Sequence, residues 1–242
     1  MKRTFGAALA LFLLATGCIF GSSPRGAADE LTALAGKVTE ATYAAVYRFN
    51  FTRQPAPGVA MKLEIAQEPP VTVRRVESTT KGEDGKTVAL SAWYVHNADG
   101  DFACNEYPKA GIRCQSDPVN RTMFGSAKLN VFFDSPREED AFSTVRKDSR
   151  TVRIAGHQAT CFEAVPLGPS AAPASPDSAA DRFRYELCYA EDGILLRGRR
   201  TTLDEGGTAD NAESFVEVAS LSRVVEPREL RLPGPVVSPD DL

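Results

Sequence analysis

Hydrophobic and polar residues alternate along most of the chain, and this pattern predicts β-strands. The clearest run begins at Tyr43, where aromatic or small apolar side chains occupy every second position as far as Phe51. Further predicted strands are 59–65, 71–77, 87–96, 151–154, 160–165, 182–189, 194–200 and 215–225. Gly, Pro, Asp and Asn separate several of them, which indicates short turns between neighbouring strands. We therefore predict a largely antiparallel sheet.

Other segments follow the spacing of a helix. Apolar residues between positions 31 and 38 recur every three or four residues, and Asp29 ahead of them can cap the helix. Residues 135–138 read Ser-Pro-Arg-Glu, a capping box that predicts a short helix ending near Val145. Residues 123–129 fit another short helix. The sum is an α+β fold, with an N-terminal helix and one or two short helices on one side of a curved antiparallel sheet.

The first residues have the composition of an export signal. Lys2 and Arg3 precede a short apolar run that ends in Ala15-Thr16-Gly17-Cys18, a lipobox. The run is shorter than the roughly 20 apolar residues that a membrane-spanning helix needs. The pattern resembles bacterial lipoprotein signals, in which cleavage precedes the cysteine and acyl chains are attached to it. We predict that residues 1–17 are removed and that Cys18 is lipidated; the alternative is an ordinary signal peptide with an incidental cysteine.

The length of the chain that remains after removal of residues 1–17 indicates one domain, which would carry a lipid anchor. Residues 18–28 suit a flexible tether, 29–233 form the α+β domain, and 234–242 are a C-terminal tail. Within the domain, residues 166–181 are rich in Pro, Ser and Ala and predict a mobile loop, and 201–211 predict a polar loop. We expect an exported protein held on the outer face of the plasma membrane, or at the outer membrane if the host has one.

The net charge of the chain excludes some classes of binding partner. Removing the signal takes away the positive charges of Lys2 and Arg3, so the formal net charge moves from −4 to −6. This acidic balance argues against nucleic acid and against a basic surface for anionic lipid. The acylated Cys18 would be the contact with the membrane, because buried acyl methylenes contribute about 0.8 kcal/mol each. We expect a monomer.

With Cys18 assigned to the anchor, an even number of cysteines remains: Cys104, Cys114, Cys161 and Cys188. In an exported protein this indicates two disulfides, for which three connectivities exist. Pairing of nearest neighbours is the most economical. A metal site is disfavoured because neither pair has C-x-x-C spacing and the two histidines are isolated.

The strand register supports the second disulfide. Placing Cys161 opposite Cys188 in antiparallel strands puts both cysteines on the outer face and sets Glu163 opposite Glu186 as an exposed pair. The same register joins apolar partners on the buried face, namely Phe162 with Leu187 and Ala164 with Tyr185.

No motif indicates catalysis, a cofactor or a metal. Ser126 lacks the G-x-S-x-G context, His157 has no acidic partner in the sequence, and His96 suits a surface position at a strand end. The acidic run 138–140 fits a helix start, and residues 99–101 fit a turn, since the calcium-loop pattern is absent. We expect no enzymatic activity.

A resemblance to a known family implies a function for this chain. The features that carry it are the signal with Cys18, the early helix, the strand Tyr43–Phe51, the Pro69-Pro70 break and the closing Leu230–Pro233. Together they resemble bacterial lipoproteins of the LolA/LolB/LppX-like carrier superfamily. Residues 156–165 and 187–196 also look like uncharacterised lipoproteins of high-GC bacteria. The resemblance implies a half-open β-barrel closed by helices, with a cavity that accepts acyl chains.

Ten apolar side chains are candidates for lining such a cavity: Tyr43, Tyr47, Phe49, Met61, Leu63, Ile65, Trp93, Phe183, Tyr185 and Leu187. The alternative is that they fill the core. Two functions follow. One is an anchored lipoprotein that binds an apolar ligand, an acyl chain or a lipid, and the other is an anchored structural or protein-interaction domain with a filled core.

The anchor can be tested by mass spectrometry of the chain purified from bacterial membranes. We expect a mature chain that starts at Cys18 and carries acyl groups on the peptide containing it. Cys18→Ser should abolish the acylation, whereas Cys104→Ser should retain it. An unmodified Cys18 in the mature chain, or cleavage at another site, would contradict the lipobox assignment.

Overall fold

The computed structural model describes residues 24–51, 60–81, 87–107, 110–116, 142–166, 182–203 and 209–238. A helix, α1 (Pro24–Gly36), and a 3₁₀ turn, η1 (Lys37–Glu40), come first, and a 3₁₀ turn, η5 (Pro227–Leu230), follows the last strand. Between them lie β1 (Tyr43–Phe51), β2 (Ala60–Glu68), β3 (Val71–Lys81), β4 (Thr87–Asn97), β5 (Gly100–Tyr107), β6 (Gly111–Ser116), β7 (Phe142–Lys147), β8 (Val152–Ile154), β9 (His157–Pro166), β10 (Arg182–Tyr189), β11 (Leu195–Leu203) and β12 (Ala209–Ser222).

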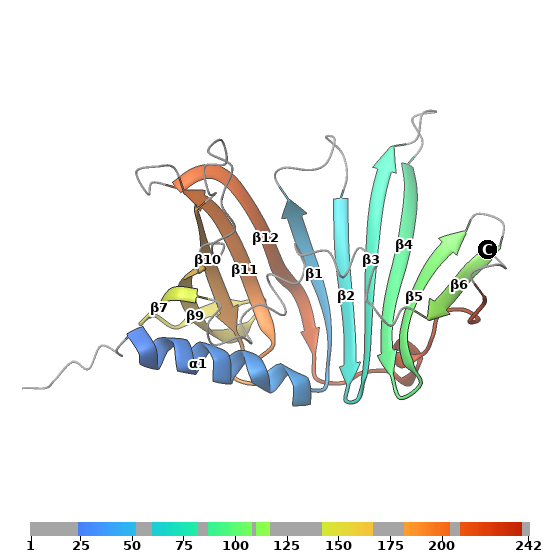
Figure 1. The fold of residues 1–242 in the computed structure, drawn as a ribbon, viewed down its shortest axis with the longest axis horizontal. Helices are drawn as coiled ribbons and strands as arrows, with labels where there is room; N and C mark the ends of the chain where they lie inside the picture. Colours follow the sequence, from blue (N-terminus) through green and yellow to red (C-terminus); the bar gives the residue numbers. More distant parts are fainter. Residues whose placement is uncertain are drawn as a thin grey trace, which may run out of the picture.

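These strands form a twelve-stranded sheet in the order β6-β5-β4-β3-β2-β1-β12-β11-β10-β9-β7, with β8 paired to β9. The first and last strands pair in its middle, where Tyr47 lies opposite Val218. The sheet is curved and open, and α1 runs along the lower end of one half (Figure 1). The predicted α+β class with a half-open antiparallel barrel is confirmed.

The sheet has two faces with different covers. We call the side that packs against α1 the helix face and the other side the opposite face. Side chains alternate between them because successive residues of a strand point to opposite sides. The larger cluster of buried side chains lies mainly on the helix face and is built from α1, the strands β1 to β3 and the strands β7 to β12.

Tyr47 lies in this cluster on the central strand β1. Its side chain is 1% exposed, and its hydroxyl donates a hydrogen bond to the Leu195 carbonyl oxygen at 2.9 Å. Burial, helped by the neighbouring Tyr43, raises the pKa of Tyr47 well above its ordinary value. The hydroxyl is therefore a donor at neutral pH, and it ties β1 to β11 through the core.

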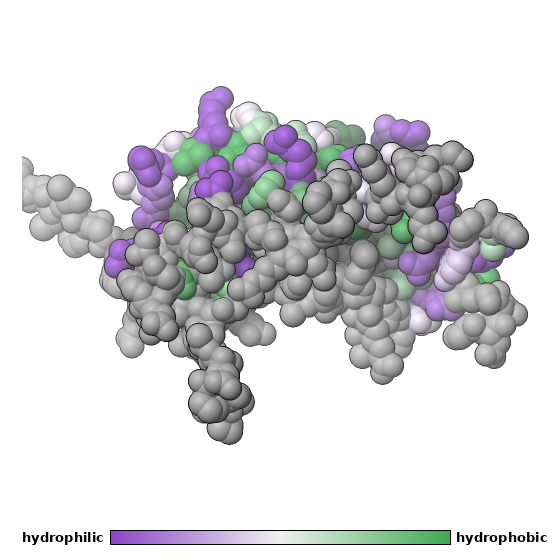
Figure 2. Space-filling model, turned by 90° about the horizontal axis from the view of Figure 1, so that it is seen from above, coloured by the Kyte–Doolittle hydropathy of each residue, from purple (hydrophilic) through white to green (hydrophobic). Residues whose placement is uncertain are grey.

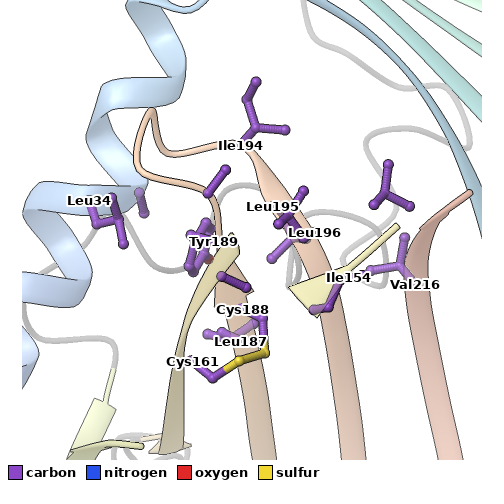
Figure 3. Close-up of a cluster of buried hydrophobic side chains, with 14 of the residues drawn as sticks. Leu34, Ile154, Cys161, Leu187, Cys188, Tyr189, Ile194, Leu195, Leu196 and Val216 are labelled. Carbon is purple, nitrogen blue, oxygen red and sulfur yellow. A yellow bond between two sulfur atoms is a disulfide. The ribbon is translucent and has the colours of Figure 1, made fainter. Parts of the chain in front are cut away.

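The helix packs tightly on the turn between β10 and β11. Leu34 of α1 points toward Tyr189 at the end of β10, and Ile194 and Leu196 continue the cluster (Figure 3). The turn requires glycine, because Gly193 has φ of +79° and a Cβ there would lie 2.3 Å from the Leu34 carbonyl oxygen. A glycine at this position lets the helix and the turn approach each other.

A second, smaller cluster lies on the opposite face of the other half of the sheet. Val73, Val95 and Phe102 are buried there, and Leu232 from the C-terminal segment packs against them. That segment passes the lower ends of β2 to β5 and reaches β6 (Figure 1). There the Cys114 amide donates to the Pro235 carbonyl and the Val237 amide donates to the Cys114 carbonyl, both at 2.9 Å. The segment therefore covers this cluster and adds a parallel bridge to the sheet edge.

Both predicted disulfides are present, Cys104–Cys114 between β5 and β6 and Cys161–Cys188 between β9 and β10. The predicted register is confirmed as well, including the opposition of Glu163 and Glu186. Arginines beside these glutamates offset their repulsion: Arg184 lies 3.8 Å from Glu163, and Arg197 lies 3.1 Å from Glu186. The cysteines are on the opposite face as expected, but they are buried.

Several predicted boundaries were wrong. The helix begins at Pro24, so residues 24–28 of the predicted tether are helical and Asp29 is not its cap. The buried Ala27 extends its apolar stripe toward the N-terminus. Residues 142–145 belong to strand β7 and not to a helix, because Val145 pairs with Ala164 on β9 and is buried there.

Other differences concern turns. The Pro69-Pro70 pair is the turn between β2 and β3, and β3 continues to Lys81. The predicted polar loop 201–211 is shorter than expected, since β11 runs to Leu203 and β12 begins at Ala209. The signal, Cys18, the helix at 123–129, the start of the helix at 135, residues 167–181 and the last residues of the tail lie outside the described residues.

The surface of the described residues is mixed in character. Viewed from above, hydrophobic and hydrophilic side chains adjoin one another along it (Figure 2). In the ranges that the structure describes, no helix is both long enough and apolar enough to span a membrane.

The two disulfides should differ in their effect on stability. In the chain-entropy model a cross-link over 27 residues stabilises more than one over 10, by about 1 kcal/mol. We expect Cys161→Ala with Cys188→Ala to lower the free energy of urea unfolding by about 1 kcal/mol more than Cys104→Ala with Cys114→Ala. A larger loss for the second pair would contradict the model and would indicate a dominant role for the bridge to the C-terminal segment.

Candidate ligand-binding groove

A groove of about 440 Å³ lies between the opposite face of the sheet and the segment after β12. Its floor crosses four neighbouring strands and consists mainly of small or flat apolar side chains: Ala44, Val46, Ala66, Val73 and Trp93. Its other wall includes η5 and the residues that follow it: Arg228, Glu229, Arg231, Leu232 and Pro233. The groove therefore has an apolar row on its floor, with Glu64 and Arg75 beside that row and further charges along the wall formed by the segment.

The strand register places the floor. Ala44 of β1 lies opposite Ala66 of β2, and Ala66 lies opposite Val73 of β3. Small side chains in adjacent positions of one face leave a depression, which a larger residue would fill. Trp93 of β4 borders this row and also packs against the second cluster.

The η5 turn holds the other wall in place by local hydrogen bonds. Glu226 and Glu229 form a capping box, in which the Glu226 amide donates to the Glu229 carboxylate at 2.8 Å. Arg228 pairs with the Glu226 carboxylate at 2.7 Å. Leu232 anchors the segment in the second cluster. The wall is thus fixed by a turn at one end and an apolar contact at the other.

Arg75 of β3 is the centre of the polar contacts in the groove. Its guanidinium lies 3.1 Å from the Glu64 carboxylate and 3.0 Å from that of Glu77, and it donates to the Ser91 hydroxyl at 3.2 Å. The guanidinium also stacks over the Trp93 ring, 5.4 Å from its centroid. Arg75 therefore joins β2, β3 and β4 on this face.

Glu64 is held in its charged form by two cations. Burial alone would raise its pKa, but the hydrogen bond and charge of Lys62 and those of Arg75 outweigh burial and lower the pKa below its ordinary value. The Lys62 ammonium is 2.5 Å from one carboxylate oxygen and Arg75 contacts the other. Both oxygens of Glu64 are thereby occupied.

Most of the residues predicted to line a cavity lie in the packed core of the helix face. Seven of the ten are buried there: Tyr43, Tyr47, Phe49, Leu63, Ile65, Tyr185 and Leu187. Met61 and Phe183 pack against the same cluster. Trp93 lies on the opposite face, and Ile65 and Trp93 are the members of the set that border the groove. Ligand binding by these ten side chains stays a prediction.

The residues of the groove floor were missed, although the sequence holds a signal for them. Ala44 and Val46 occupy the face of β1 that alternation assigns to water, and Ala66 does so on β2. Small apolar residues grouped on a supposedly wet face indicate a cover over that face. The sequence holds no such signal for the wall formed by the C-terminal segment. Leu232 is 10 residues beyond the end of β12, outside any strand whose alternation could place it against the sheet.

A second groove, of about 500 Å³, lies on the opposite face across β7, β9, β10 and β11. It is lined by arginines and acids, among which Arg150 contacts Asp148 at 3.3 Å and Arg184 contacts Glu163. These pairs neutralise each other around the Cys161–Cys188 disulfide. Glu186 lies near the two sulfurs, but cysteines joined in a disulfide are not thiolate ligands for a metal.

The sequence matches no family model and no curated protein. Among solved structures, a chain in the crystal structure of MucB in complex with MucA(peri) aligns with a TM-score of 0.46 and 15% identity, over 85% of this chain and 59% of that one. LprF from Mycobacterium bovis aligns with a TM-score of 0.44 and 10% identity, over 88% of this chain and 99% of LprF. The chain thus spans about three fifths of the length of the first of these.

The cations around Glu64 predict a pH dependence of stability. Because the pKa of Glu64 is lower than 4.5 in the folded chain, the ionised carboxylate stabilises the fold above that pH, and the contribution is lost as the pH falls through the folded pKa. Glu64→Gln should therefore lower the free energy of unfolding at pH 7 and have a smaller effect at pH 3. Glu68→Gln, at an exposed position of the same strand, is the control. An effect of Glu64→Gln that is equal at both pH values would contradict this explanation.

Proposed function

We propose that this protein is an exported lipoprotein, anchored through Cys18, that binds an apolar ligand such as an acyl chain or a lipid. The observation that supports the proposal is the groove beneath the C-terminal segment, with its floor of small apolar side chains and Trp93. A ligand site of this kind is concave and mostly apolar, with a few polar groups that orient the ligand. The groove volume of about 440 Å³ lies within the range of about 300–1,000 Å³ of such sites.

This proposal moves the site from the face that the sequence suggested. On the helix face, nine of the ten predicted lining side chains belong to one packed cluster with α1. On the opposite face, β1 and β2 carry the small residues Ala44 and Ala66, and a groove lies between them and the segment. Binding needs no nucleophile and no acid–base pair, and we propose no catalytic role for the protein.

A second candidate function is that of an anchored protein-interaction domain. Its support is the packed core of the helix face together with Val88 and Leu90 on β4, whose side chains are 42% and 51% exposed. The two residues are two positions apart on one strand, so they point to the same side of the sheet. Exposed apolar neighbours of this kind suit a contact with another protein.

Filling the groove distinguishes the two functions. Ala44→Phe places a bulky side chain on the groove floor, so we expect it to remove apolar ligand that copurifies with the mature chain, measured by native mass spectrometry and organic extraction. Ala89→Phe is the matched control. Ala89 lies on the same face of the sheet as Trp93, but it is exposed and is not among the groove residues. Both variants should retain the unfolding transition.

Three results are informative. Loss of lipid in Ala44→Phe alone supports the groove. Equal lipid in both variants contradicts it as the binding site. Absence of apolar ligand from the unsubstituted chain, together with failure to bind added fatty acid, contradicts the lipid-binding function and favours the interaction domain, whose partner should then crosslink near Val88 and Leu90.

A further inference from the structure

Positive charge gathers at one end of the sheet, in the stretch that runs from the end of β7 through β8 to the start of β9. Residues 146–157 contain a single acid, Asp148. Their basic members are Arg146, Lys147, Arg150 and Arg153. The stretch has a formal charge of +3, whereas the mature chain as a whole has −6. The total charge, which argued against a basic surface, therefore averages over a region that is basic. We call residues 146–157 the basic end.

Two of the four cations are paired within the protein. Lys147 contacts the Glu30 carboxylate of α1, and Arg150 lies 3.3 Å from the Asp148 carboxylate. Arg146 and Arg153 are exposed, and neither forms an ion pair with a residue that the structure describes. The basic end therefore presents two arginines to an anionic partner.

The charges around the basic end do not cancel it. Glu163 of β9 lies opposite Arg146 in the register, but its carboxylate is 3.8 Å from Arg184 of β10. The nearby part of α1 adds one cation and two acids, namely Arg25, Asp29 and Glu30. Together with these neighbours the basic end has a net charge of +2. The acidic run 138–140 precedes the other end of β7 in the sequence and lies outside the described residues.

The basic end lies close to the predicted anchor. α1 packs against β7 and begins at Pro24, six residues after Cys18 (Figure 1). Six extended residues span at most about 20 Å. Glu30, the partner of Lys147, is six residues further along, which is about 9 Å in a helix. A chain held at Cys18 therefore keeps the basic end near the bilayer surface.

From these observations we propose that the basic end is a docking surface for the anionic head groups of the membrane to which Cys18 is attached, so that β7 and β8 face the bilayer. The inference goes beyond ligand binding in the groove, and it rests on the anchor at Cys18 that the proposed function includes. The acyl chains supply the attachment. The arginines set the orientation, because their attraction to anionic head groups acts within a Debye length of about 8 Å.

Vesicle binding tests this surface without the anchor. The mature chain with Cys18→Ser is sedimented with vesicles of phosphatidylcholine alone, or of phosphatidylcholine and phosphatidylglycerol in equal parts. We expect binding to the anionic vesicles that weakens as salt is raised, because ions screen the attraction between exposed charges. The neutral vesicles should leave most of the chain in solution.

Two double variants locate the contact. Arg146→Gln with Arg153→Gln should weaken binding to the anionic vesicles roughly 25-fold, since each basic residue near the surface contributes about fivefold. Arg48→Gln with Arg113→Gln is the matched control, because it changes the net charge equally but on β1 and β6. The control should bind almost as the unsubstituted chain does. Both double variants should retain the unfolding transition.

The orientation is measured with the chain attached to vesicles. Cys18 is the single cysteine outside the two disulfides, so it can be coupled in vitro to a lipid that carries a maleimide. In a Trp93→Phe background, Thr151→Trp places the only tryptophan at an exposed position of the basic end, and Ala89→Trp places it at an exposed position of β4. Lipids spin-labelled at the head group should quench the fluorescence of Thr151→Trp much more than that of Ala89→Trp.

The outcomes separate this proposal from the anchor. If anionic and neutral vesicles bind the chain alike, or if the two double variants weaken binding equally, the docking surface is refuted while the anchor stands. Equal quenching of the two tryptophan variants refutes the orientation. The anchor itself fails separately, through an unacylated Cys18 in the chain purified from bacterial membranes.

Discussion

The pairing of β1 with β12 is the contact on which the rest of the structure depends. It joins the first and last strands of the sheet and thereby connects the half formed by β2 to β6 with the half formed by β7 to β11. Pairing of strands so distant in sequence carries a large loop-closure cost in entropy, which the contacts at this junction must offset. Tyr47 strengthens the junction because its hydrogen bond to Leu195 reaches across β12 to β11.

An open sheet of this size has two apolar regions that need separate covers. On one side α1 covers the cluster around Tyr189 and Ile194. On the other side the C-terminal segment covers Val73, Val95 and Phe102 with Leu232. The cover on the helix face is closely packed, as the approach of Gly193 to Leu34 shows. The other cover leaves a groove over Ala44 and Ala66, and this contrast is why the candidate site lies there.

The sequence predicted the strands and the local pairing well because both depend on short-range patterns. The alternation in residues 182–189 was sufficient to align Cys188 with Cys161 and to predict their bond. It could not predict that residues 142–145 form a strand, since a capping box there competes with the pairing of Val145 and Ala164, which tertiary contacts decide. The groove was beyond the sequence for a similar reason, as its wall comes from residues that meet the sheet only in the folded chain.

The hydrogen bonds between Cys114 and the C-terminal segment have a consequence beyond the groove. An end strand normally exposes a row of amide and carbonyl groups to which the strand of another molecule can pair. Here Pro235 and Val237 occupy those groups at Cys114, in the middle of β6, and the close fit of Gly234 against Ile112 keeps the segment near the strand. The chain thus covers part of one edge of its own sheet, which favours molecules that stay separate at high local concentration.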